Sequence, residues 1–215
     1  MQKKIVSSVL GIVLLGMAAQ AQSTTIFNSL SDSIIGEGPI GTDPFGPPPM
    51  NGDNWRAQSF MTGGANWTSE SVTLSLLSVG SSTGGFTVSL YGDSGNGPGT
   101  QLGTLTGNGN PGTGLSSFTG AITLNPDATY WIVTDVSSDH SGSVYGWMAG
   151  TGGPAVGSTV GAGYSSDGGA SWGTDSSSSY LMQVDADLTS APEPSTMVLA
   201  GLGGVGCLLQ IRRRR

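Results

Sequence analysis

The sequence has few charged side chains and almost none of the residues that form cross-links or bind metals. Charged residues make up 10% of the 215 positions, against roughly 25% in an ordinary soluble domain. Cys207 is the only cysteine and His140 the only histidine. A disulfide framework is therefore excluded, and a zinc site built from several cysteines and histidines nearly so. We expect stability to come from a hydrophobic core.

Basic residues are also scarce, and almost all of them lie at the two ends. Lys3 and Lys4 stand near the start and residues 212–215 are arginines, so Arg56 is the only basic residue between. Residues 22–190 contain 13 acidic residues, the 14 of the whole chain minus Glu193, and one basic residue, which gives a charge of about −12. This region offers no basic surface for phosphate contacts, and nucleic acid is excluded as a partner.

The first 21 residues have the three parts of a signal peptide. Met1 to Lys4 form a basic segment, Ile5 to Ala18 an apolar segment, and Ala19-Gln20-Ala21 the small-residue pattern that signal peptidase recognises. Ala19 and Ala21 are the predicted recognition residues, and cleavage after Ala21 would leave Gln22 as the mature terminus. The sequence therefore predicts export.

The last 25 residues, 191–215, repeat this combination of apolar and basic segments in a different order. The extended Pro192-Glu193-Pro194-Ser195 stretch precedes an apolar run from Met197 to Ile211, and the arginines Arg212, Arg213, Arg214 and Arg215 follow. Fifteen helical residues span about 22 Å, less than the roughly 30 Å hydrocarbon core of a bilayer. We expect a short helix that anchors the chain transiently in the inner membrane, with the arginines in the cytoplasm. Cys207 lies within this run and is interpreted as an apolar filler.

These three parts, in this order, resemble the PEP-CTERM sorting signal of Gram-negative bacteria. The resemblance implies recognition by an exosortase, a membrane protease-transpeptidase that removes the hydrophobic tail and releases the protein or transfers it to a surface carrier. A plain tail anchor without processing is the alternative. Such tails are also labelled ice-binding protein C-terminal domains, but the threonines here are scattered over unlike strands and do not predict an ice-binding array.

The region between the two ends has the pattern of an all-β domain. Apolar and polar residues alternate with a period of two, and turns rich in glycine, asparagine and proline separate the runs. About eight short strands of this kind predict a β-sandwich, jelly-roll or immunoglobulin-like, over residues 22–190. The expected strands are 24–30, 56–62, 72–76, 86–91, 102–106, 118–124, 130–136, 143–148 and 180–189.

Tryptophans and one proline-rich segment complete the prediction for this domain. In the absence of a disulfide, the five tryptophans should supply much of the core together with the aliphatic strand faces; they are Trp55, Trp67, Trp131, Trp147 and Trp172. The segment from Glu37 to Asp53 is rich in proline and glycine, and we predict a surface loop there.

Several short motifs of this domain resemble the choice-of-anchor R family of extracellular bacterial domains. They are Phe27-Asn28, residues 57–60, residues 86–91 with the loop 93–100, Leu124-Asn125-Pro126, and residues 129–131. The resemblance implies an exported β-domain that occurs with alternative surface-anchoring tails, and it assigns no catalytic residue.

No catalytic set is evident. Gly92-Asp93-Ser94-Gly95 resembles a serine nucleophile motif, but His140 follows the serine, and no acid stands where a hydrolase of this pattern needs it. A tight turn explains the same residues. Asp93 and Asn96, with Ser94, are weak calcium candidates in a glycine-rich loop; Asp135 with Asp139 and Asp185 with Asp187 are further options. No other cofactor is expected.

The predicted function is a structural or adhesive role, without catalysis, at the cell surface, in the outer envelope or in the extracellular matrix. Signal peptidase and exosortase are the expected partners during export, and extracellular polysaccharide is a further one. The alternative is a carbohydrate-binding module or glycan-acting protein, in which exposed aromatic residues stack on sugars. Tyr145, Trp147 and Trp172 are the candidates, and core packing is the competing explanation for each.

Overall fold

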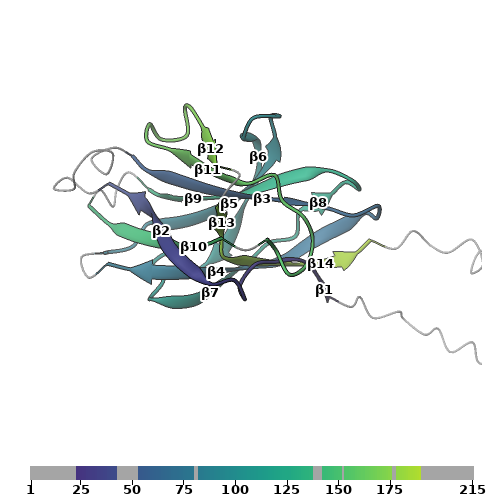
Figure 1. Cartoon of the computed structure of the whole chain (residues 1–215), viewed down its shortest axis with the longest axis horizontal. Helices are drawn as coiled ribbons and strands as arrows, with labels where there is room; N and C mark the ends of the chain where they lie inside the picture. The colour runs from purple at the N-terminus through teal and green to yellow at the C-terminus, as the bar shows by residue number, and fades with distance from the viewer. Residues whose placement is uncertain are drawn as a thin grey trace, which may run out of the picture.

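The computed structural model describes residues 23–42, 53–79, 82–137, 142–151, 153–175 and 178–189. All its regular elements there are β-strands, which confirms the all-β prediction (Figure 1). The described ranges contain no helix of sufficient length and hydrophobicity to cross a membrane. The predicted signal peptide with Ala19 and Ala21, the Pro192 to Ser195 stretch, the apolar run and the terminal arginines lie outside the described residues.

The strands are short and follow one another closely along the chain. They are β1 Ser23–Asn28, β2 Ile34–Gly41, β3 Trp55–Met61, β4 Trp67–Ser78, β5 Phe86–Asp93, β6 Pro98–Gly107, β7 Gly114–Thr119, β8 Thr123–Leu124, β9 Thr129–Val136, β10 Val144–Gly150, β11 Ala162–Ser165, β12 Gly173–Asp175, β13 Ser179–Tyr180 and β14 Met182–Leu188.

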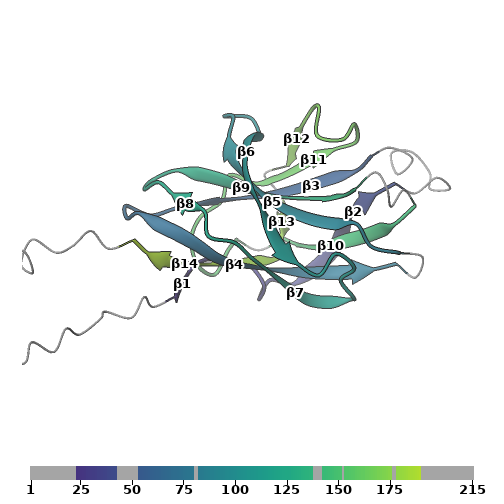
Figure 2. The same cartoon turned by 180° about the vertical axis from the view of Figure 1, so that it is seen from behind.

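The strands form one open sheet that folds into two facing layers. The main path runs β1-β14-β4-β7-β6-β5-β9-β3-β11-β12, while β10 pairs with β2, β4 and β13, and β8 pairs with β4. Strand β6 pairs with β7 of one layer and with β5 of the other, and so joins them. Figures 1 and 2 show β3, β5, β9 and β11 in one layer and β1, β2, β4, β7, β10 and β14 in the other. This arrangement is the predicted sandwich.

The core lies between the layers and is built largely from aromatic contacts. Phe27 of β1 lies 6.4 Å from Phe60 of β3, measured between ring centroids. Phe86 of β5 meets Tyr145 of β10 edge to face at 5.0 Å. Both pairs join strands of opposite layers, so burial of these rings holds the sandwich closed.

The five tryptophans divide between two sites instead of sharing one core. Trp147 is fully buried between the layers, and Trp67 packs against the same cluster. Trp131 is also buried, but it forms a second cluster with Trp55 and Trp172 on the outer face of the β3–β9 layer. The prediction that tryptophans build the core is therefore confirmed for Trp147 and Trp67 between the layers and for the buried Trp131 in the second cluster, whereas Trp55 and Trp172 are partly buried residues that pack against that second cluster.

All nine expected strand regions contain strands, but the predicted loop from Glu37 to Asp53 is wrong over its first residues. Glu37 to Gly41 belong to β2, which pairs antiparallel with β10. Strand β2 pairs with β10 alone, and Pro39 is tolerated because an edge strand has backbone positions that no ladder hydrogen bond requires. The short strands β11 and β12 also lie in segments that the periodicity did not reveal.

Gly38 illustrates why glycine occurs within β2. The Tyr180 ring lies across this residue, so that a Cβ at position 38 would come within 2.4 Å of the tyrosine hydroxyl. The same ring stacks on Trp147 at 5.0 Å and 20°. Tyr180 is therefore held between a glycine and an indole, and Gly38 provides the space that it needs.

Replacing Gly38 by alanine should destabilise the fold by about 1–3 kcal/mol, because the stacked Tyr180 ring has no room to withdraw. For a domain of this size the thermal midpoint falls by roughly 2–4 °C per kcal/mol. Gly36→Ala is the matched control, since a Cβ at position 36 meets nothing within 4 Å, and its midpoint should not fall. Equal midpoints for the two variants, measured by thermal unfolding, would contradict this account of Gly38.

Candidate functional site

The two termini of the described domain lie side by side at one end of the sandwich. Strand β1 begins at Ser23, which pairs with Asp187 near the end of β14. The amide of Thr189 donates to the carbonyl of Asn66 at 2.9 Å, which fixes the chain just before residue 190. Both predicted sorting segments therefore connect to the same end of the domain (Figure 1).

The predicted calcium residues lie in a closed turn between β5 and β6. Asp93 is an exposed residue, and its carboxylate accepts a hydrogen bond from Trp131 Nε1 at 2.8 Å. The Ser94 backbone amide and hydroxyl both donate to the carbonyl of Gly97, at 2.9 and 2.8 Å. Asn96 lies exposed in the same turn. Within the described ranges no three acidic, histidine or cysteine side chains come together as a metal site.

The other two acidic pairs differ in their surroundings. Asp185 accepts hydrogen bonds from Thr25 at 2.7 Å and from Gln183 at 2.9 and 3.0 Å, so neighbouring side chains already occupy its oxygens. Asp135 faces the outer side of β9, but Asp139 lies outside the described residues.

The serine motif is a turn in this structure. The Ser94 hydroxyl points to the Gly97 carbonyl, and His140, the other residue that a nucleophilic mechanism would use, is outside the described residues. The geometry agrees with the tight-turn interpretation of residues 92–95.

Two of the three candidate sugar-binding aromatics are buried in the core. Tyr145 is 1% exposed and Trp147 is fully buried. The Tyr145 hydroxyl donates to Asn110 Oδ1 at 2.9 Å, and Trp147 Nε1 donates to the Leu181 carbonyl at 3.0 Å. Neither ring is available to stack on a ligand, and core packing explains both.

Trp172, the third candidate, belongs to an aromatic group on the outer face of the β3–β9–β5 layer. Strand alternation places Trp55 and Ala57 of β3 on this face, with Trp131 and Val133 of β9 beside them. Trp172 and Tyr91 complete the set, and both rings are partly exposed. We refer to Trp55, Tyr91, Trp131 and Trp172 as the outer aromatic cluster.

Carboxylates border the outer aromatic cluster. Asp93 accepts from the indole of Trp131, and Asp53 accepts from the indole of Trp55 at 3.1 Å. Burial, with a smaller contribution from the nearby Asp53 carboxylate, raises the pKa of Asp135 to about 6. The result is an outer face on which three partly exposed rings, those of Trp55, Tyr91 and Trp172, lie near three acidic side chains. Such a combination can contact both the apolar faces and the hydroxyl groups of a sugar.

Sequence analysis did not identify the outer aromatic cluster, although β9 contained a signal for it. The run from Tyr130 to Val133 has apolar residues at consecutive positions, which is the pattern of a strand covered on both faces. The second cover is the segment from Ala162 to Asp175, whose strands are too short to show a period.

Comparison with known families places a sorting motif directly after the domain. Residues 190–215 match the PEP-CTERM protein-sorting motif, in agreement with the resemblance described above. A PEP-CTERM motif implies processing by an exosortase and export to the cell envelope or surface. No curated protein matches the chain.

The raised pKa of Asp135 predicts a measurable effect of pH on stability. The folded protein binds this proton more tightly than the unfolded chain, so the ionised carboxylate destabilises the fold above pH about 6. This penalty disappears as the pH falls toward 3.8, the ordinary value for an aspartate.

Asp135→Asn should therefore raise the free energy of unfolding at pH 7 by about 1 kcal/mol, a value reduced for partial solvent exposure. At pH 4 the variant and wild type should differ little. Denaturant unfolding at both pH values checks this, with Glu70→Gln as a control at an exposed site on β4. A variant without gain at pH 7, or with the same gain at both pH values, would show that Asp135 is not the group responsible.

Proposed function

We propose that this chain is an exported protein with a structural or adhesive role at the cell surface or in the extracellular matrix. In this proposal signal peptidase removes residues 1–21 after Ala21. The domain of residues 22–190 then remains attached to the inner membrane through the C-terminal segment until exosortase acts. The observation that carries the proposal is the sorting motif at residues 190–215, which begins where the last strand of the domain ends.

The geometry of the domain supports this order of events. Because Ser23 and Asp187 pair on neighbouring strands, both membrane-directed segments leave the same end of the sandwich, and the rest of the domain projects away from the membrane. Its charge of about −12 favours solubility outside the cell and reduces non-specific association with anionic surfaces.

The proposal includes no catalytic activity of the domain. Ser94 is used in closing a turn, and two of the carboxylates that border the outer aromatic cluster, Asp53 and Asp93, accept hydrogen bonds from indole groups. Signal peptidase and exosortase are the partners during export, and their own residues carry out the cleavage chemistry.

Replacing Pro192, Glu193 and Pro194 by alanine in the native host should leave the protein in the inner membrane. The wild-type chain should be found in the outer envelope or the medium, because exosortase needs the extended motif before it can remove the tail. Cell fractionation with an antibody to the β-domain measures the distribution. Thr189→Ala, just before the matched segment, is the control and should behave as wild type. Equal distribution of the triple variant and wild type would contradict recognition of this motif.

A second candidate function is carbohydrate binding, and the outer aromatic cluster favours it. The cluster joins partly exposed rings to the carboxylates Asp53, Asp93 and Asp135 on one face of the sandwich. Trp172 lies between two glycines, since added Cβ atoms at Gly97 and Gly163 would approach it to 3.1 and 3.4 Å. This close backbone packing holds the ring in place before a ligand arrives, which lowers the entropic cost of binding.

If the cluster binds sugars, Trp172→Ala should weaken binding to extracellular polysaccharide of the host at least tenfold, the effect of losing an aromatic contact of about 1.4 kcal/mol. Sedimentation with the purified polysaccharide measures the bound fraction. Trp67→Ala, in a partly buried tryptophan that packs against the main core, is the control, and thermal unfolding of both variants verifies folding. Unchanged binding by a folded Trp172→Ala variant would exclude the outer aromatic cluster as the sugar site.

A further inference from the structure

Arg56, the only basic residue of the acidic domain, is buried between the layers. Alternation along β3 turns Arg56, Gln58 and Phe60 inward, and only 7% of the Arg56 surface is exposed. Its Nη1 donates to the carbonyl of Trp55 at 3.2 Å, whereas its buried Nε has no hydrogen-bond partner. No carboxylate forms an ion pair with Arg56 in the part of the chain that the structure describes.

A pocket of about 310 Å³ opens beside this guanidinium. Its walls come from the two layers: Ile35 to Pro39 of β2 and Ala149 of β10 on one side, and Arg56 with residues 162–164 of β11 on the other. The β2 wall includes Glu37, whose carboxylate lies over Gly146 and forms no ion pair with Arg56 among the described residues. Tyr180 and Ser178 also line it. The volume lies at the lower end of the range for small-molecule sites, roughly 300–1,000 Å³.

Two tyrosine rings border the pocket and are held by glycines. Tyr180 lies between Gly38 and Trp147, as described above. Tyr164 pairs with Arg56 across the β11–β3 ladder, is 51% exposed, and packs over Gly173, where an added Cβ would come within 2.4 Å of the ring. The exposed Tyr164 ring and the buried Tyr180 ring therefore give the pocket apolar surfaces next to the Arg56 guanidinium.

None of the described residues compensates the charge of Arg56 with an ion pair. Burial lowers the pKa of the guanidinium from its ordinary value, but an arginine stays protonated in proteins. A buried cation without a counter-ion costs stability, whereas a carboxylate that accepts two parallel hydrogen bonds from a guanidinium restores it. An anionic group small enough to enter the pocket would therefore give Arg56 the partner that the described residues do not provide.

We propose that this pocket binds the carboxylate of an acidic sugar, with the guanidinium of Arg56 holding the carboxylate and the rings of Tyr164 and Tyr180 lying against the sugar. The sugar part of this inference rests on the proposed location in an extracellular polysaccharide matrix. A single terminal sugar acid fits better than a long polyanion, because the charge of about −12 on the domain repels an anionic polymer.

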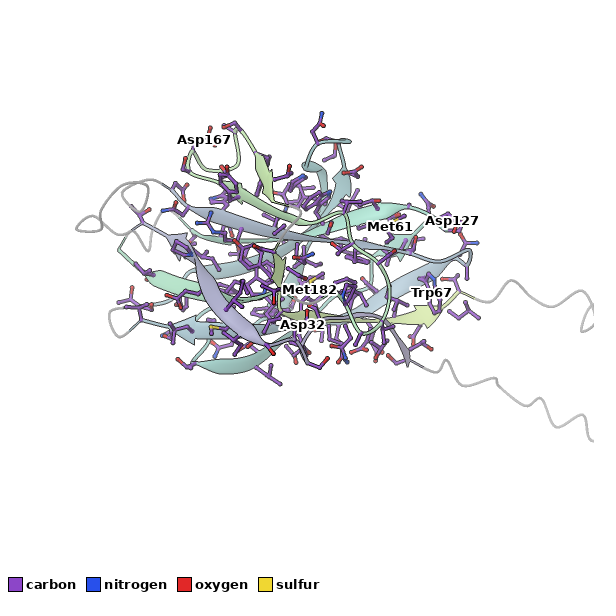
Figure 3. The ribbon with its side chains drawn as sticks, in the orientation of Figure 1. Asp32, Met61, Trp67, Asp127, Asp167 and Met182 are labelled. Atoms are coloured by element: carbon purple, nitrogen blue, oxygen red, sulfur yellow. The ribbon has the colours of Figure 1, made fainter. Side chains whose placement is uncertain are left out.

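The pocket lies away from the end of the domain that connects to the C-terminal segment, so a ligand could reach it while the chain is still anchored in the membrane. Met61, at the other end of β3, pairs with Thr129 of β9. The amide of the next residue, Thr62, donates a hydrogen bond to the carbonyl of Ala128, near the end of the domain at which β14 ends. Figure 3 shows Met61, Asp127 and Trp67 together at that end. Arg56 is five residues away along an extended strand, about 16 Å, so the pocket lies away from the membrane-proximal end.

Calorimetric titration of the full chain, purified in detergent, with sodium glucuronate tests the proposal. We expect saturable binding that glucose, which has no carboxylate, does not reproduce, and that acetate, which has no sugar ring, reproduces at least tenfold more weakly. Arg56→Met should lose at least tenfold in affinity for glucuronate. It should fold with an equal or higher thermal midpoint, since it removes an unpaired buried charge.

Glu70→Gln is the control, because Glu70 is exposed on β4 and does not line the pocket, and the variant should bind glucuronate as wild type does. Absence of glucuronate binding to the wild-type chain, or equal binding by a folded Arg56→Met variant, would overturn the proposal. Equal affinity for acetate, or tighter binding of inorganic phosphate, would overturn the assignment to a sugar acid. The titration uses purified protein, so its outcome does not depend on whether the chain is sorted as proposed above.

Discussion

The alternation of side chains along β3 is the constraint on which both candidate sites depend. Arg56, Gln58 and Phe60 face the core, and Trp55 and Ala57 face outward. A shift of one residue in its pairing with β9 would bury the outward residues and expose the inward ones. Gln58 opposes such a shift, because its side chain accepts from the Tyr180 amide at 2.7 Å and donates to the Gly161 carbonyl at 3.2 Å. One strand thereby fixes the pocket on its inner side and the outer aromatic cluster on its other side.

The distribution of charge follows the division of the chain into two terminal export segments and the domain between them. The basic residues at the two ends belong to segments predicted to direct export, and the domain between them is left strongly acidic. In that setting a single buried arginine is unusual, because it faces no ion-pair partner among the described residues. An ion pair of a surface arginine would be screened by solvent and contribute little, whereas a buried arginine beside an open, partly apolar pocket favours small anions as ligands.

The sequence predicted most of the strands because their residues alternate, and it identified the sorting motif because its three parts lie in order along the chain. It did not predict β2, since Gly36, Gly38 and Pro39 have low strand propensity, and the reason for Gly38 is a contact with Tyr180 about 140 residues away in the chain. The outer aromatic cluster and the Arg56 pocket were missed for a related reason. Both bring together residues of strands that are distant in sequence, and periodicity carries no information about which strands become neighbours.

The central claim is that this acidic β-domain reaches the outside of the cell with its sorting tail removed. The most direct measurement is the intact mass of the protein recovered from the envelope or medium of a host that has an exosortase. The account predicts a chain that begins at Gln22 and has lost the apolar segment 197–211 together with the terminal arginines. A mass that includes every residue through Arg215 would contradict it.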